Sequence, residues 1–126
     1  MNTIGWIEVG TDHPAEAEKF YGELFGWTFT DDDTSIGLDG EAYRMVTGPD
    51  GGAPFGGFYG TGGKAPQQAI FLVVVADTEA VCRQAVAGGA TVLVGPQREA
   101  NGLVFARLAD PLGNLFGVFT PPAPRS

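Results

Sequence analysis

Two hydrophobic periods alternate along the chain. Residues 3–10 alternate apolar and polar side chains, a period typical of a half-buried strand. Apolar residues then recur at helical spacing, at Ala17, Phe20, Tyr21 and Leu24. Three short strand-like segments follow, and after a glycine-rich connector the same order begins again near residue 67. The pattern therefore predicts a strand–helix–three-strand unit that is used twice.

Cap and turn residues mark the ends of both predicted helices. The first helix is predicted to begin at Asp12, as its N-terminal cap, and to end at Gly26. The second is predicted to begin after Asp77 and to end at Gly88–Gly89. The two halves match in the order of these signals, although their sequences are hardly alike.

Seven further strands complete the prediction, over residues 27–30, 41–47, 54–60, 68–75, 90–94, 102–108 and 114–119. In each half the helix covers one face of a four-stranded sheet and leaves the other bare. We expect an α+β fold in which two such sheets curve around a shared cleft. One domain over residues 1–126 is predicted, with modules at about 3–60 and 67–120, a flexible linker at 61–66 and a tail at 121–126.

Charge and composition exclude several classes of function. The net charge is −8, and the seven Lys and Arg residues form no cluster, which excludes a nucleic-acid-binding surface. No apolar run reaches the roughly 20 residues of a membrane helix, and no secretory signal is visible, so we expect a cytoplasmic protein. The acidic run Asp31–Asp33 is interpreted as a solvated turn, with a cation site as the alternative.

The single cysteine and the single histidine are interpreted as structural. Cys82 has no second cysteine to pair with, and its apolar neighbours Val81 and Val86 indicate a small buried residue. His13 lies at the start of the other predicted helix, so we expect no Cys–His pair.

Five segments of the chain are similar to one known family: Thr11–Asp12, Phe20–Tyr21, Leu24–Trp27, Gly88–Ala90 and Asp110–Phe116. With the doubled order, they resemble the vicinal oxygen chelate superfamily, which includes glyoxalase I, bleomycin-resistance proteins and extradiol dioxygenases. The resemblance implies two tandem βαβββ modules that form a curved mixed sheet around a cleft, and a homodimer. In metal-using members it also implies four cleft-facing ligands, usually His and Glu or Gln.

Transferred by position, those metal ligands are missing. The resemblance puts them at Trp6, near Ile70, at Gly117 and within Phe55–Gly57, where Gly57 would mirror Gly117. None of these residue types binds a divalent cation through its side chain. We therefore expect no cofactor, and a displaced divalent metal site stays open as the alternative.

Strand alternation predicts which side chains line the cleft. Trp6 and Glu8 would face it, while Ile7 and Val9 would pack under the helices. Trp6, Tyr43, Phe58 and Tyr59 either stack on a ligand or fill the core. The predicted ligand-binding residues are Trp6, Glu8, Tyr43, Phe55, Phe58, Gln68, Ile70, Leu72, Arg107 and Gly117. Arg98 is expected to be a solvated charge in a polar loop, whereas Arg107 could bind a ligand carboxylate.

Glu8 is the predicted catalytic residue. A carboxylate among aromatic and aliphatic groups is costly to bury, so we expect its pKa to be raised. One interpretation makes Glu8 a general base or an anchor for a cationic ligand. The other makes it a structural acceptor from the backbone, from Arg107 or from Arg44.

Three functions follow from this reading. The first is a metal-free protein of the family that binds or sequesters a hydrophobic or aromatic small molecule. The second is an enzyme, either a metal-dependent lyase, isomerase or dioxygenase or a metal-independent catalyst that uses Glu8. The third is a structural or regulatory domain with a vestigial cleft.

Overall fold

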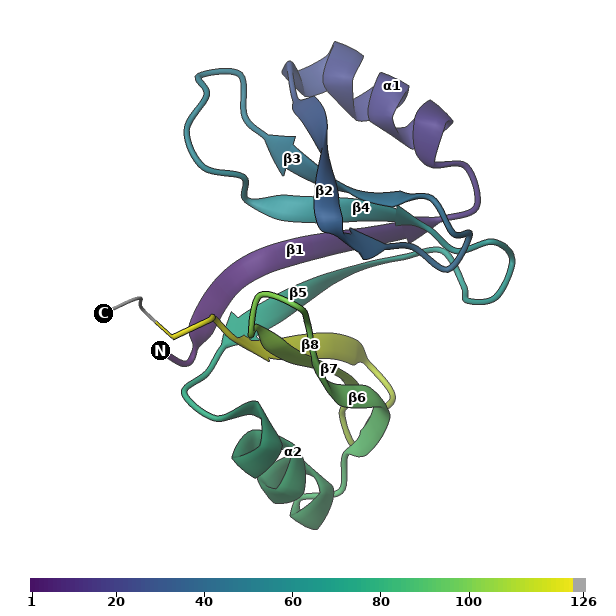
Figure 1. Ribbon diagram of the computed structural model, residues 1–126. Helices are drawn as coiled ribbons and strands as arrows, with labels where there is room; N and C mark the ends of the chain where they lie inside the picture. The colour runs from purple at the N-terminus through teal and green to yellow at the C-terminus, as the bar shows by residue number, and fades with distance from the viewer. Residues whose placement is uncertain (124–126) are drawn as a thin grey trace. The chain divides into compact units, whose positions relative to one another are not determined.

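The computed structural model describes residues 1–123, and residues 124–126 of the predicted tail lie outside the described residues. The elements follow the predicted order, strand, helix and three strands, twice (Figure 1). They are β1 (Thr3–Thr11), α1 (Pro14–Phe25), β2 (Thr28–Ile36), β3 (Ala42–Thr47), β4 (Gly56–Gly60), β5 (Gln68–Val74), α2 (Thr78–Ala87), β6 (Thr91–Arg98), β7 (Val104–Ala109) and β8 (Leu115–Thr120). The predicted α+β class with two βαβββ modules is confirmed.

The chain divides into two compact units. The N-terminal unit is Trp6–Ala69, and the C-terminal unit is Ile70–Ser126 together with Met1–Gly5. The predicted single-domain organisation over residues 1–126 stays a prediction. Within the described part of the chain, no helix is long and apolar enough to cross a membrane.

Strand pairing is the same in both units. The N-terminal unit has the order β2-β3-β4-β1, with β1 parallel to β4 and the other pairs antiparallel. The C-terminal unit has the order β5-β8-β7-β6, with β5 parallel to β8. Glu8 pairs with Gly57 in the first parallel ladder, and Leu72 pairs with Gly117 in the second. Gly57 and Gly117 therefore occupy matching places, as the internal repeat predicts.

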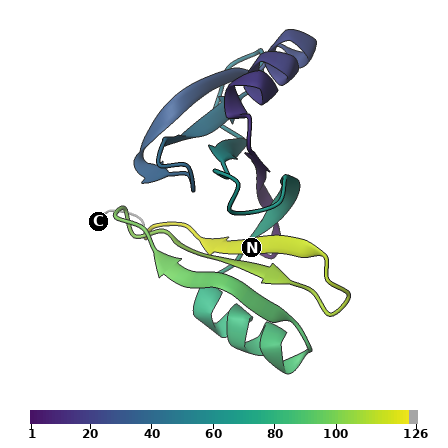
Figure 2. The same cartoon turned by 90° about the vertical axis from the view of Figure 1, so that its right-hand side faces the viewer.

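In the C-terminal unit α2 covers one face of its sheet (Figure 2), and an apolar core lies between them. Its buried members are Val75, Cys82, Ala106, Leu108 and Val118. Burial, together with the nearby charge of Glu79, raises the pKa of the Cys82 thiol. The prediction that Cys82 is a small buried residue is confirmed.

Aromatic rings fill the space between α1 and its sheet in the N-terminal unit. The Tyr21 ring stacks on Trp27 at 5.5 Å and meets the edge of Phe58 at 5.6 Å. Phe58 is fully buried, whereas Phe20 and Leu24 of α1 are 60% and 59% exposed. Of the large apolar residues that predicted this helix, Tyr21 contacts Phe58 of the sheet, whereas Phe20 meets the edge of the Tyr21 ring.

The two predicted helix caps differ in outcome. Asp77 caps α2 as predicted, because its carboxylate accepts a hydrogen bond from the Ala80 amide at 3.0 Å. The prediction for Asp12 is wrong, since His13 is the cap residue of α1 and none of the described side chains caps that end. The Asp12 carboxylate instead accepts hydrogen bonds from the Thr61 hydroxyl and from the Gly63 amide.

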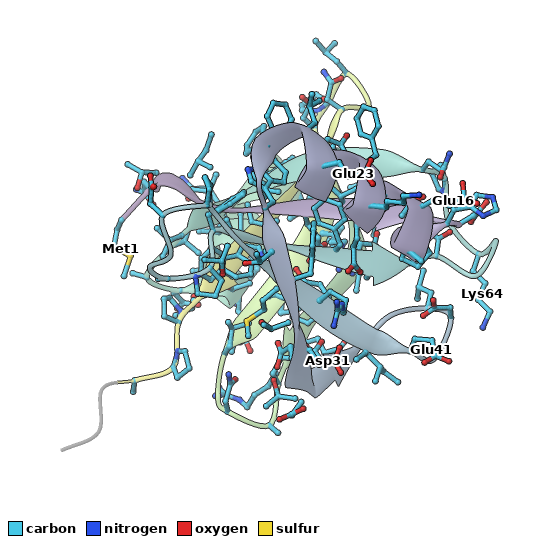
Figure 3. The ribbon with its side chains drawn as sticks, turned by 90° about the horizontal axis from the view of Figure 1, so that it is seen from above. Met1, Glu16, Glu23, Asp31, Glu41 and Lys64 are labelled. Atoms are coloured by element: carbon cyan, nitrogen blue, oxygen red, sulfur yellow. The ribbon has the colours of Figure 1, made fainter. Side chains whose placement is uncertain are left out.

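Two predicted loops belong to strands. β2 continues through Asp31–Asp33, and Asp31, labelled in Figure 3, forms an ion pair with Arg44 of β3 at 2.7 Å. The predicted solvated turn is therefore wrong, because cross-strand pairing extends the strand. β6 likewise continues to Arg98, which is exposed and donates a hydrogen bond to the Gly102 carbonyl.

The start of the predicted flexible linker is fixed to the corner between β1 and α1. Thr61 is fully buried, and its amide donates to the Thr11 carbonyl at 2.9 Å. The Thr61 hydroxyl and then the Gly63 amide stabilise the Asp12 carboxylate, which lowers its pKa below the ordinary value of 3.8. Because the folded-state pKa is lowered, ionised Asp12 stabilises the fold above pH 3.8, and this contribution is lost as the pH falls through the lowered pKa.

We predict that Asp12→Ala lowers the thermal unfolding midpoint at neutral pH, and that the difference from the unsubstituted protein shrinks in acid well below pH 3.8. Thermal melts followed by circular dichroism at a series of pH values measure it. Asp50→Ala removes an exposed carboxylate from a turn and serves as the control. A difference between Asp12→Ala and the unsubstituted protein that stays constant into acid would contradict the assigned role.

Candidate functional site

A hydrogen-bonded cluster lies on the sheet of the N-terminal unit, on the face opposite α1. Trp6 and Glu8 share this face of β1, as strand alternation predicts, and Tyr43 reaches them from β3. The Trp6 Nε1 donates to the Tyr43 hydroxyl at 2.9 Å, and that hydroxyl donates to the Glu8 Oε2 at 2.9 Å. Three residues that the sequence predicted to bind ligand are thereby in direct contact.

The direction of the two hydrogen bonds follows from the chemistry of the groups. An indole N–H is only a donor, so the Tyr43 oxygen must be its acceptor. The single phenolic proton is then directed to Glu8, which is 5% exposed. Tyr43 was not among the partners predicted for Glu8. Arg44 was among them, but it lies on the opposite face of the sheet, where it forms ion pairs with Glu18 at 2.9 Å and with Asp31.

Gly57 creates the space that the Tyr43 side chain fills. It lies on β4 between the two other strands, paired with Glu8 of β1. A Cβ atom at residue 57 would lie 1.9 Å from the Tyr43 hydroxyl oxygen. The backbone there is not left-handed, so the requirement for glycine is one of space alone. Tyr43 therefore lies across β4 where a side chain of residue 57 would stand.

Tyr59 and Gln68 continue the same face. The Tyr59 ring is nearly parallel to Tyr43, with 6.4 Å between centroids and 8° between planes. Its hydroxyl accepts a hydrogen bond from the Gln68 Nε2 at 3.1 Å. We call Trp6, Glu8, Tyr43, Tyr59 and Gln68 the aromatic face. The sequence left Tyr59 open between ligand stacking and core filling and did not include it in the ligand-binding set, although alternation from Gly57 along β4 places it on this face.

The structure separates Phe55 and Phe58 from this cluster. Phe58 alternates with Tyr59 on β4 and is buried against Tyr21 and Phe29 on the helix side. The Phe55 ring lies 5.0 Å from Trp27, in the same ring cluster. Both were predicted to bind ligand, and that role stays a prediction for each of them.

Four further predicted residues lie in the C-terminal unit. Leu72 pairs with Gly117, and a Cβ atom at residue 117 would lie 2.7 Å from the Leu72 Cγ. Arg107 pairs with Gly117 from the other side, and its guanidinium lies 5.3 Å from the Phe105 ring centre. Ile70 and Leu72 are 8% and 5% exposed. The binding role of these residues stays a prediction.

The positions that the family uses for a metal do not suit a divalent cation here. Trp6 offers an N–H donor, and Ile70, Gly57 and Gly117 offer no ligand atom in a side chain. The space beside the two glycines is filled by Tyr43 and by Leu72. Among residues 1–123, no group of three or more His, Cys, Asp or Glu is arranged to hold a metal ion. The donor set therefore does not fit the family's metal.

We predict that Gly57→Ala displaces the Tyr43 side chain and lowers the free energy of unfolding by about 2–4 kcal/mol, through overpacking and the loss of two hydrogen bonds. In a double-mutant cycle with Tyr43→Ala, the combined loss should fall short of the sum by about 1 kcal/mol or more. Chemical denaturation measures these energies. Gly48→Ala is the control, because a Cβ atom there meets no atom within 4 Å. Additive losses would contradict the assigned contact.

Comparisons with known proteins agree with the fold. The family model described as Glyoxalase/Bleomycin resistance protein/Dioxygenase superfamily matches residues 3–118. The CFP32 proteins of Mycobacterium bovis and Mycobacterium tuberculosis, provisionally named glyoxylases, are 27% identical over 127 residues. The match covers 94% of this chain and 46% of each relative, so the chain spans about half the length of the curated relatives it matches.

Methylmalonyl-CoA epimerases are among the solved structures with the same fold. A Streptomyces coelicolor variant in complex with 2-nitronate-propionyl-CoA gives a TM-score of 0.67 at 20% identity, covering 98% of this chain and 99% of the other. The Mycobacterium tuberculosis epimerase gives 0.63 at 16% identity, covering 97% and 89%. At these identities the likeness concerns the fold alone. The family match over residues 3–118, with the doubled βαβββ order, shows that the chain belongs to the Glyoxalase/Bleomycin resistance protein/Dioxygenase superfamily.

Proposed function

We propose that the chain is a small-molecule-binding member of this superfamily that holds an aromatic ligand on its aromatic face without a metal. One observation carries the proposal. The resemblance puts metal ligands of this unit at Trp6 and within Phe55–Gly57, and here the Tyr43 hydroxyl lies over Gly57 and joins Trp6 to Glu8. A ligand at this face would meet aromatic rings and fixed polar groups rather than a cation.

The chemistry of the aromatic face supports a ligand with a planar ring. Ligand sites are commonly apolar and aromatic, with a few polar groups that fix orientation. Trp6 is partly exposed and offers ring surface for stacking, and its hydrogen bond to the buried Tyr43 holds its side chain in place. Glu8 adds a carboxylate, and the protein carries a net charge of −8, so a neutral or cationic ligand is favoured over an anion.

The relatives support the general class of ligand. Epimerases of this fold have been solved in complex with 2-nitronate-propionyl-CoA and with methylmalonyl-CoA, and the CFP32 proteins are named as glyoxylases. Both point to small organic molecules as the class that this fold accommodates. Pairing of two subunits, which the family resemblance implies, stays a prediction.

Catalysis by Glu8 is the second candidate function. A buried carboxylate positioned by Tyr43 is a plausible base in a fold shared with epimerases. A base must reach a substrate proton, however, and Glu8 is 5% exposed with its Oε2 already bonded to Tyr43. The geometry therefore favours the binding role. Deuterium exchange into methylmalonyl-CoA that is lost in Glu8→Gln would favour the enzyme instead.

We predict that planar polycyclic aromatic compounds quench the fluorescence of Trp6 in a saturable manner. The chain has two tryptophans, so the titration uses Trp27→Phe, which leaves Trp6 as the reporter. The matched control is Trp6→Phe, which leaves Trp27 in the ring cluster with Tyr21 and Phe55. Its fluorescence should change little. No response from Trp6 across a broad panel, or an equal response from Trp27, would contradict the proposed site.

A further inference from the structure

We infer that Gln68 selects the ligand of the aromatic face by accepting a hydrogen bond from a hydroxyl or amine on its ring. The inference rests on the proposed function and names the chemistry of that same site. Its starting point is the Gln68 Oε1, which is buried and has no hydrogen-bond partner among the described residues. Buried polar atoms are nearly always paired, so this acceptor calls for a donor.

The Gln68 amide is held in place from one end. Its Nε2 donates to the Tyr59 hydroxyl at 3.1 Å, which fixes the position of the Oε1 on the same amide. Tyr59 is itself held, because its ring lies parallel to Tyr43 and its hydroxyl lies over Gly10. A Cβ atom at residue 10 would be 2.6 Å from that hydroxyl, so glycine is needed there for space. The acceptor is therefore part of a preorganised arrangement.

The neighbouring glutamine shows that the local chain can satisfy such a group. The Gln67 Oε1 accepts hydrogen bonds from the Thr11 hydroxyl and from the Asp12 amide. The amide oxygens of these two neighbouring glutamines therefore differ, since Gln67 has two hydrogen-bond donors and Gln68 has none among residues 1–123. Gln67 ties the connector to the corner between β1 and α1, which leaves Gln68 as the residue available for recognition.

A ligand that donates a hydrogen bond to the Gln68 Oε1 should bind more tightly than a ligand of the same shape that has no donor. A site built to bond a hydroxyl rejects the analogue that lacks it, because the buried acceptor is then left unpaired. A carboxylate on the ligand would instead meet this oxygen, and it would share the face with the carboxylate of Glu8. The geometry therefore points to phenols and aryl amines, neutral or cationic, as the ligand class.

The test compares 2-naphthol with 2-methoxynaphthalene, which keeps the rings and lacks the donor, and with 2-naphthoate, which is an anionic acceptor. Equilibrium dialysis against the unsubstituted protein should show about tenfold tighter binding of 2-naphthol than of either other probe. Gln68→Leu should reduce the preference over 2-methoxynaphthalene to near one, whereas Gln68→Glu, which retains an acceptor, should keep it. Gln97→Leu, at an exposed glutamine of β6, is the matched control and should leave the ratio unchanged.

The outcomes separate this inference from the proposed function. Equal binding of the naphthol and its methyl ether to the unsubstituted protein would overturn the role of Gln68 and leave the binding function standing. Tighter binding of 2-naphthoate would overturn it too, since that preference requires the opposite amide orientation with Nε2 as the unpaired group. No binding of any probe would overturn the proposed function and, with it, the inference. Thermal melts confirm that each variant is folded.

Discussion

The Tyr43 hydroxyl is the group on which the N-terminal unit's chemistry depends. It takes a hydrogen bond from Trp6 and gives one to Glu8, and it reaches both only because residue 57 is glycine. A buried carboxylate needs such a partner, because burying it without a hydrogen bond is costly. The same contact fills the place of a side chain that would reach towards a metal. Glycine at residue 57 is therefore needed both for the packing of Tyr43 and for the hydrogen bonds that Tyr43 forms with Trp6 and Glu8.

The two units share one strand order but place different side chains on their sheets. Beside Gly57 the N-terminal unit places a phenol that joins an indole to a carboxylate, whereas beside Gly117 the C-terminal unit places the aliphatic side chain of Leu72. The helix side shows a similar contrast, with aromatic rings packed against α1 and a mainly aliphatic core packed against α2. The repeat therefore preserves backbone pairing while the side chains differ, which fits a fold that accommodates many chemistries.

The features that the sequence predicted correctly are those set by residues close together in the chain. Two-residue alternation placed Trp6 and Glu8 on one face, and the doubled order of elements predicted the α+β fold. What the sequence missed depends on distant partners. The Tyr43 bond to Glu8 joins residues 35 positions apart, and Asp12 binds Thr61 49 positions away rather than capping α1. Pairing of Asp31 and Asp32 with β3 likewise makes this acidic segment part of a strand. Such contacts form only once the sheet is assembled.

The central claim is that the aromatic face works without the family's metal, and the metal content of the protein tests it most directly. Protein purified without chelator is analysed for zinc, nickel, iron and manganese by mass spectrometry. The account predicts far less than one metal ion per chain, because Trp6 and Gly57 offer no side-chain ligand and Tyr43 fills the space beside Gly57. One stoichiometric metal ion per chain would contradict it.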